Sequence, residues 1–238
     1  LPQAPQQFKQ LYIASGIDKY FQIAPCFRDE DSRADRSPGE FYQIDMEMSF
    51  ATQEDILDII SRLLFNIFDN FKFQGKSINS LPFPLISYKK SIEDFGCDKP
   101  DLRNPLRLVN VTDFFKGSGL QIFESLIDKG AIVNCIQAIN SDGKARSFYD
   151  NLNKWAREQG KKGLGYMNFE NLEAKGPLAK NFNPEKLSEM MQANNFNKKD
   201  GLLFICDMPH DAYDFGSKVI AKVGDELELI DKSRYEFC

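Results

Sequence analysis

One stretch, residues 27–47, decides the fold: Phe27-Arg28-Asp29-Glu30 precedes a charged run, and Phe41-Tyr42-Gln43-Ile44-Asp45-Met46-Glu47 follows it. Alternate side chains of a β-strand lie on the same face of a sheet. In a hairpin of the two segments, one face would carry Cys26, Arg28, Glu30, Phe41, Gln43, Asp45 and Glu47. The other face would carry Phe21, Ile23, Pro25, Phe27, Tyr42, Ile44, Met46 and Met48. The pattern predicts a hairpin with an apolar face that forms a core and a second face that displays an arginine, an aromatic ring and carboxylates.

The alternation also fits a purely structural hairpin. An ordinary half-exposed sheet shows the same succession of polar and apolar side chains. A charged run such as residues 28–36 is also typical of a solvated loop. The pattern alone leaves both interpretations open, so the identity of the residues has to separate them.

Three strings of residues favour a functional hairpin. The string Phe27-Arg28-Asp29-Glu30, with Phe41 on the returning strand, resembles motif 2 of class II aminoacyl-tRNA synthetases. With the loop to Glu40, it is similar to the bacterial-type aspartyl-tRNA synthetases. Residues 1–10 and 96–105 resemble two further segments of that family in the same order, with Ala4 and Cys97 where the family usually has serine. The chain is identified as a member of this family that contains motif 2 and the insertion called the GAD domain.

The resemblance implies an α+β fold with two parts. One is part of the antiparallel class II synthetase sheet with flanking helices, and the other is an inserted α+β GAD domain. We expect residues 1–107 to form a partial catalytic core, residues 108–206 the GAD-like domain, and residues 207–238 a return segment to the core.

Local patterns predict the helices and strands. Thr52-x-x-Asp55 is a capping-box pattern, and apolar residues at helical spacing follow it as far as Phe71. Further helices are expected over residues 88–95, 119–128, 147–159, 184–194 and 210–226. Strands are expected over residues 83–87, 108–111, 131–139, 164–169 and 201–206.

Joining an amino acid to ATP brings a carboxylate against a phosphate, and a fixed cation must lie between them. The guanidinium of Arg28 is suited to this because it is always charged and donates in a rigid fork. Stabilising charge at the α-phosphate is commonly the largest catalytic contribution. The resemblance implies that Arg28 is catalytic. It also implies an ATP site of Arg28, Asp29, Glu30, Ser37 and Phe41, in which Glu30 accepts from the adenine amino group and Phe41 stacks on the ring. No phosphate-binding loop sequence occurs.

The resemblance also implies an aspartate site and a tRNA contact. Aspartate would be bound by Gln6, Lys9, Arg28 and Asp45. Lys9 would meet the side-chain carboxylate of the substrate, and Asp45 would bind the α-amino group or hold Lys9 in place. By themselves, Gln6 and Lys9 also fit the start of a solvent-facing helix. Arg33 and Arg36 would contact the acceptor end of the tRNA.

Composition bounds the class of protein. The 238 residues are 42% hydrophobic, which suffices for a core, and the net charge of −5 argues against a polybasic nucleic-acid binder. Five scattered cysteines without Cys-x-x-Cys spacing predict reduced thiols. The lone His210 has no partners at metal-ligand spacing, so we expect no metal site in this chain. No apolar run reaches the length of a membrane span, and a cytoplasmic protein is expected.

The resemblance also implies that three parts of the family are missing from this sequence: the anticodon-binding barrel, motif 1 and motif 3. The parent is expected to be a homodimeric aspartate–tRNA ligase that uses L-aspartate, ATP with Mg²⁺, and tRNA(Asp), and this polypeptide alone is expected to be inactive. Whether tRNA(Asn) is a second acceptor stays open. The alternative function is a non-catalytic synthetase-like module that binds tRNA or a partner. An asparaginyl or lysyl relative conflicts with the inserted domain and with residues 96–103.

Overall fold

The computed structural model describes residues 1–29, 39–141, 143–170, 173–180 and 182–238. The chain forms two compact units, residues 1–67 and residues 68–238, and each is described by itself. We call them unit 1 and unit 2. Four of the predicted site residues, Glu30, Arg33, Ser37 and Arg36, lie outside the described residues.

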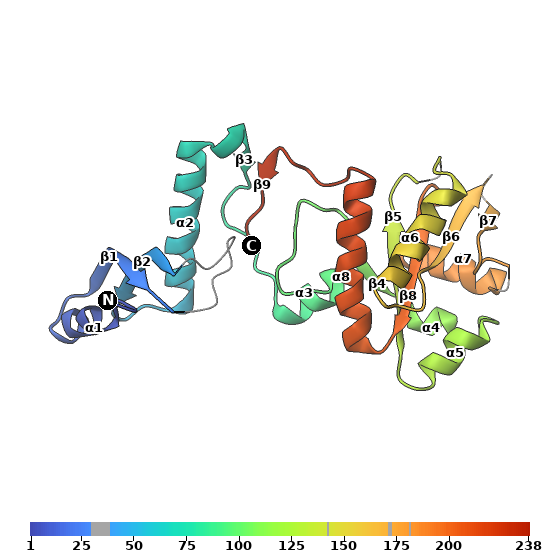
Figure 1. The fold of residues 1–238 in the computed structure, drawn as a ribbon, viewed down its shortest axis with the longest axis horizontal. Helices are drawn as coiled ribbons and strands as arrows, with labels where there is room; N and C mark the ends of the chain where they lie inside the picture. The colour runs from blue at the N-terminus through green and yellow to red at the C-terminus, as the bar shows by residue number, and fades with distance from the viewer. Residues whose placement is uncertain (30–38, 142, 171–172, 181) are drawn as a thin grey trace. The chain divides into compact units, whose positions relative to one another are not determined.

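Unit 1 is built on the predicted hairpin. Helix α1 (Gln6–Ala14) precedes strands β1 (Lys19–Phe27) and β2 (Glu40–Met48), and helix α2 (Gln53–Phe71) follows them and runs on into unit 2 (Figure 1). The strands pair antiparallel, with Gln22 opposite Asp45 and Cys26 opposite Phe41. The hairpin and its division into two faces are therefore confirmed.

The prediction of which hairpin face is buried was wrong. The apolar face is exposed in this chain, since Phe21 is 71%, Ile23 65% and Tyr42 70% accessible. The polar face is the covered one: α1 lies against it through Lys9 on Asp45 and Tyr12 on Tyr20, and Cys26 and Asp45 of this face are buried. In unit 1, helix α1 lies beside the two-stranded hairpin and covers the face on which Lys9 pairs with Asp45. The opposite, apolar face is left exposed.

The predicted capping box of α2 is confirmed. Asp55 accepts hydrogen bonds from the backbone N–H and the hydroxyl of Thr52, at 2.8 and 2.9 Å, and Thr52 Oγ1 accepts from the N–H of Asp55. The first of these bonds lowers the pKa of Asp55 most. Reciprocal bonds of this kind satisfy backbone groups that a helix start leaves unpaired.

Unit 2 is a sheet covered by helices on both faces (Figure 1). Its helices are α3 (Tyr88–Phe95), α4 (Thr112–Phe115), α5 (Gln121–Ile127), α6 (Arg146–Glu158), α7 (Pro184–Ala193) and α8 (Pro209–Glu226). The sheet, in the order β4-β5-β8-β6-β7, consists of β4 (Leu108–Asn110), β5 (Ile132–Ala138), β8 (Gly201–Asp207), β6 (Gly165–Glu170) and β7 (Glu173–Lys175). A short 3-10 turn, η1 (Phe73–Gly75), precedes β3 (Ser77–Ile78), which pairs parallel with β9 (Arg234–Tyr235).

Two apolar cores lie on opposite faces of the antiparallel sheet. Side chains of α6 and α8 pack on one face, where Leu152, Leu203 and Phe215 are at most 2% exposed. Side chains of α4 and α7 pack on the other face, where Phe115 and Met190 are fully buried. Strands β4, β5, β6 and β8 contribute apolar side chains to both faces, and the mixed α and β architecture expected from the sequence is present.

Helix α8 packs tightly on the segment before β4. A Cβ added at Gly96 would lie 2.1 Å from the carbonyl oxygen of Tyr213, and one at Gly224 would lie 2.2 Å from Asn104 Nδ2. That amide group donates to the carbonyl oxygen of Ile220 at 3.0 Å. The string that resembles a family segment is thus a close contact with α8. The predicted boundaries at residues 107/108 and 206/207 stay predictions.

Most predicted elements of unit 2 are confirmed to within one or two residues at each end, but residues 83–87 form neither strand nor helix. Pro84 has no N–H to donate to a sheet. Phe83 is buried by stacking on Phe237, with ring centroids 5.3 Å apart, and not by pairing with a strand. Helix α1 was expected only as the alternative of a solvent-facing helix start at Gln6 and Lys9, and its Lys9 is in fact buried. Helix α4 and the short strands β3, β7 and β9 were not predicted.

Candidate functional site

Helix α1 brings a lysine onto the polar face of the hairpin. The helix begins after Pro5, and Gly16, with a φ of 99°, follows its end. Phe8 and Leu11 are 65% exposed, whereas Lys9 is only 9% exposed. The helix therefore turns its charged residue, and not its apolar ones, towards the strands. Burial of a lysine is costly unless a partner compensates the charge.

The partners of Lys9 are two carboxylates of β2. Lys9 Nζ lies 2.7 Å from Asp45 Oδ1 and 3.4 Å from Glu47 Oε2. The hydrogen bond to Asp45 raises the pKa of Lys9 more than burial lowers it, so the ammonium stays charged. Asp45 and Glu47 are two residues apart on one strand and therefore share a face. Period-two spacing predicted that Glu47 lies on this face, but no sequence signal indicated its contact with Lys9.

Asp45 keeps one oxygen available. Its side chain is 5% exposed, and Oδ2 is buried without a hydrogen-bond partner among the residues that the structure describes. A buried carboxylate oxygen without a partner is uncommon because it forgoes both water and protein donors. The position can accept from a cationic group beside Lys9, such as an ammonium.

Arg28 and Phe41 lie next to each other at the end of the same hairpin where the two strands approach the connecting segment. The guanidinium carbon of Arg28 is 5.1 Å from the centre of the Phe41 ring. The backbone N–H of Arg28 donates to the carbonyl oxygen of Gly39 at 2.9 Å, and its Nε donates to the carbonyl oxygen of Gln3 at 3.4 Å. A planar cation and an aromatic ring thus lie on the hairpin that also holds Lys9 and Asp45.

Two predicted site residues are at the surface. Gln6 and Asp29 are exposed, and the structure gives neither a side-chain hydrogen bond to another described residue. Cys26, which the sequence did not assign to a site, is fully buried between the carbonyl of Ala24 and the amide oxygen of Gln43, each 3.7 Å from its sulfur. Its position on the polar face was predictable from the strand alternation, but its burial was not.

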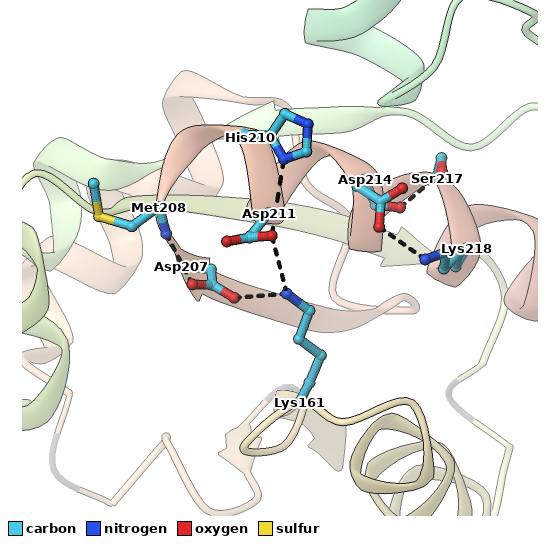
Figure 2. A network of polar contacts seen from close by, with 8 residues as sticks. All are labelled: Lys161, Asp207, Met208, His210, Asp211, Asp214, Ser217 and Lys218. Carbon is cyan, nitrogen blue, oxygen red and sulfur yellow. Dashed lines mark hydrogen bonds and ion pairs between the residues drawn. The ribbon is translucent and has the colours of Figure 1, made fainter.

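A second polar cluster lies in unit 2, at the start of α8. Lys161 Nζ lies 2.9 Å from Asp207 Oδ2 and 3.8 Å from Asp211 Oδ1 (Figure 2). A cavity of about 200 Å³ adjoins it, with Cys206 in its wall. Burial, assisted by the Asp207 carboxylate, raises the pKa of the Cys206 thiol to about 11. Lys161 is paired with two carboxylates and the Cys206 thiol is protonated at neutral pH, which fits a structural network better than a reactive site.

His210 stands at the beginning of α8, and its side chain is 94% exposed (Figure 2). Its Nδ1 is 3.8 Å from Asp211 Oδ1. Within the described part of the chain, no three His, Cys, Asp or Glu side chains are grouped to hold a metal ion. No helix of that part is long and apolar enough to cross a membrane.

Comparison with known proteins agrees with the hairpin geometry. The family "tRNA synthetases class II (D, K and N)" matches residues 1–233. Because the match covers nearly the whole chain, the chain belongs to this family of class II tRNA synthetases.

Within this family, the chain is similar to several ligases of the same name. The chain is 50% identical, over all 238 residues, to the aspartate–tRNA(Asp/Asn) ligase of Paramagnetospirillum magneticum, and covers 27% of that protein. It is 48% identical to the ligase of the same name from Acidiphilium cryptum and 49% identical to that of Orientia tsutsugamushi, again over its whole length and covering 40% of each. The chain spans about a quarter to two fifths of the length of these curated relatives.

Proposed function

We propose that the chain is part of an aspartate–tRNA ligase, which activates L-aspartate with ATP and transfers it to the 3′ end of a tRNA. The single observation that supports this best is the buried Lys9–Asp45 pair with its unpartnered carboxylate oxygen, on the hairpin that also carries Arg28 and Phe41. Identity to aspartate–tRNA(Asp/Asn) ligases over the whole chain supports the same function.

Arg28 is the proposed catalytic residue. In the first step a carboxylate oxygen of aspartate attacks the α-phosphorus of ATP, and the bond from that phosphorus to the bridging oxygen breaks as pyrophosphate leaves. The guanidinium of Arg28 would hold the carboxylate and the α-phosphate together and stabilise the charge on the phosphate oxygens. Its side chain makes one hydrogen bond to the described residues, to the carbonyl of Gln3, so donors remain for both anions.

Lys9, Asp45 and Gln6 are the proposed aspartate contacts. The ammonium of Lys9 would meet the side-chain carboxylate of the substrate, and Asp45 Oδ2 would accept from its α-ammonium group. Asparagine has the same size but no side-chain charge, so a buried lysine whose raised pKa keeps it charged at neutral pH favours aspartate. Gln6 lies on the first turn of the same helix and would contact the amino acid beside Lys9.

The nucleotide and tRNA contacts extend from the hairpin. We propose that Phe41 stacks on adenine, that Glu30 accepts from its amino group, and that Asp29 and Ser37 complete the ATP site. The tRNA acceptor end would meet Arg33 and Arg36. These assignments rest on the motif 2 resemblance, and only Asp29, Phe41 and Arg28 belong to the described residues.

Further features of the whole protein are proposals as well. The names of the relatives support two acceptors, tRNA(Asp) and tRNA(Asn). We also propose a cytoplasmic homodimer and Mg²⁺ as the companion of ATP. Because the described residues contain no group suited to a metal ion, we assign Mg²⁺ no ligands and no step in this chain.

Residues 108–206 are proposed to be a GAD domain inserted into the catalytic core. This range contains the whole five-stranded sheet except Asp207 at the end of β8, but it excludes α8, which buries Phe215 and Val219 against that sheet. Expression of residues 108–206 tests the boundaries. Cooperative unfolding would support them, and failure to fold would assign α8 to the domain.

The proposed function is tested by aspartate-dependent exchange of pyrophosphate into ATP, followed by aminoacylation of each tRNA, with the full-length protein. Exchange with aspartate and not with asparagine is expected. The second candidate function, a non-catalytic module that binds tRNA or a partner, predicts tRNA binding without any exchange. Charging of tRNA(Asp) alone would limit the proposal to one acceptor.

A further inference from the structure

Among the described residues, two arginines lie over phenylalanine rings, and their surroundings differ. The Arg107 guanidinium is 4.1 Å from the centre of the Phe95 ring in unit 2. Its Nη1 also donates to the carbonyl oxygens of Asn104 and Leu106, at 2.7 Å each. Two short hydrogen bonds fix this side chain in place, so its contact with the ring is structural.

The Arg28 side chain in unit 1 is held far more weakly. Its guanidinium is 5.1 Å from the centre of the Phe41 ring, and its one hydrogen bond to the described residues, Nε to the carbonyl oxygen of Gln3, measures 3.4 Å. That distance is at the outer limit of a hydrogen bond. Contact with the Phe41 ring is therefore a main interaction of the Arg28 guanidinium when no ligand is bound.

We infer that Arg28 covers the Phe41 ring in the unliganded protein and competes there with an incoming adenine, so that the site selects phosphorylated nucleotides against adenosine. The inference rests on the proposed function, in which adenine stacks on Phe41. An adenine base can take the ring only if the guanidinium leaves it. A nucleotide compensates that loss because its phosphate forms a charge-assisted pair with the displaced arginine. Adenosine has no phosphate and offers no such compensation.

The size of the effect follows from the strength of the contact. A cation over an aromatic ring at a partly exposed site contributes enough to change a dissociation constant about two- to five-fold. Removing the arginine should strengthen adenosine binding by that factor. The same change should weaken AMP binding, because the phosphate then loses its cation. Opposite signs for the two ligands distinguish competition from a general loss of the site.

The experiment is calorimetric titration of the full-length protein with adenosine and with AMP. Arg28→Met keeps an unbranched side chain like the stem of arginine and removes the guanidinium with its charge. Compared with the wild type, it should bind adenosine two- to five-fold more tightly and AMP more weakly. In a Phe41→Leu background, Arg28→Met should no longer strengthen adenosine binding, because there is no ring to free. The matched control is Arg62→Met, which removes an exposed arginine of α2, paired with Asp58, and should change neither affinity.

Each outcome decides between the alternatives. Thermal unfolding shows whether each variant is folded, and Arg28→Gln replaces Arg28→Met if the latter is not. Unchanged or weaker adenosine binding by a folded variant, with AMP still bound by the wild type, would overturn the competition and leave the proposed function intact. If the wild type binds neither ligand, the proposed nucleotide site fails, and this inference fails with it.

Discussion

The two units bury opposite kinds of residue. In unit 1 the buried side chains include the ion pair of Lys9 and Asp45, while Phe21 and Ile23 of the hairpin are exposed. In unit 2 apolar clusters fill both faces of the sheet, and its ion pairs, such as Lys161 with Asp207, lie nearer the surface.

The difference has a physical basis. A two-stranded hairpin is at best marginally stable by itself, whereas a five-stranded sheet between helices has enough apolar contact to be stable. A buried ion pair adds little or no net stability. Unit 1 therefore carries a feature that stability does not explain, and the proposed binding of aspartate does. In unit 2, by contrast, the apolar cores on the two faces of the sheet are explained by packing.

The largest expected effects concern packing. Leu203→Ala in unit 2 removes a fully buried side chain and should lower the free energy of unfolding by about 2–5 kcal/mol. Ile23→Ala, on the 65% exposed position of the hairpin, should change it by less than about 0.5 kcal/mol. Urea unfolding of the 238-residue chain, followed by circular dichroism, measures both. Equal effects of the two substitutions would abolish the contrast between the units.

The second comparison is between two arginine side chains, Arg28 of unit 1 and Arg103 of unit 2. Arg28→Lys in the full-length protein should lower the rate of pyrophosphate exchange about 10²- to 10³-fold, because lysine cannot hold two anions in a bidentate geometry. Arg103 of unit 2 also makes a bidentate contact, with Nε and Nη2 each 2.8 Å from Asp101. Arg103→Lys is the matched control and should leave the exchange rate within about two-fold. Normal exchange by a folded Arg28→Lys variant would remove Arg28 from the mechanism.

The sequence predicted the hairpin with its two faces, and most elements of unit 2, because period-two and helical patterns depend on local geometry. It did not predict the burial of Lys9, because the lysine becomes buried only where α1 crosses the face of β2. It also assigned the wrong face of the hairpin to the core. Which face of the hairpin is buried depends on the face against which the neighbouring helix packs. The alternation of residues such as Phe21 and Gln22 is the same whichever face the helix covers.

The smallest expected effect is the pH dependence of the Lys9–Asp45 pair. The pKa of Lys9 is raised in the folded state above its ordinary value of 10.5. Its contribution to stability is therefore fully present below about pH 10.5 and is lost as the pH rises through the raised folded value. The difference in urea midpoint between the wild type and Lys9→Met should be constant from pH 7 to 9 and should shrink at higher pH. A difference that grows with pH would contradict this sign.

The central claim about the molecule is that Lys9 recognises the side-chain carboxylate of aspartate. The decisive measurement is kcat/KM for aspartate and for asparagine in pyrophosphate exchange, with the full-length wild type and with Lys9→Met. Thermal unfolding followed by circular dichroism shows whether each protein is folded. We predict that Lys9→Met lowers kcat/KM for aspartate about 30-fold or more, the effect of removing one partner of a buried charge pair, and reduces the preference over asparagine. A folded Lys9→Met variant that uses aspartate as well as the wild type does would contradict the account.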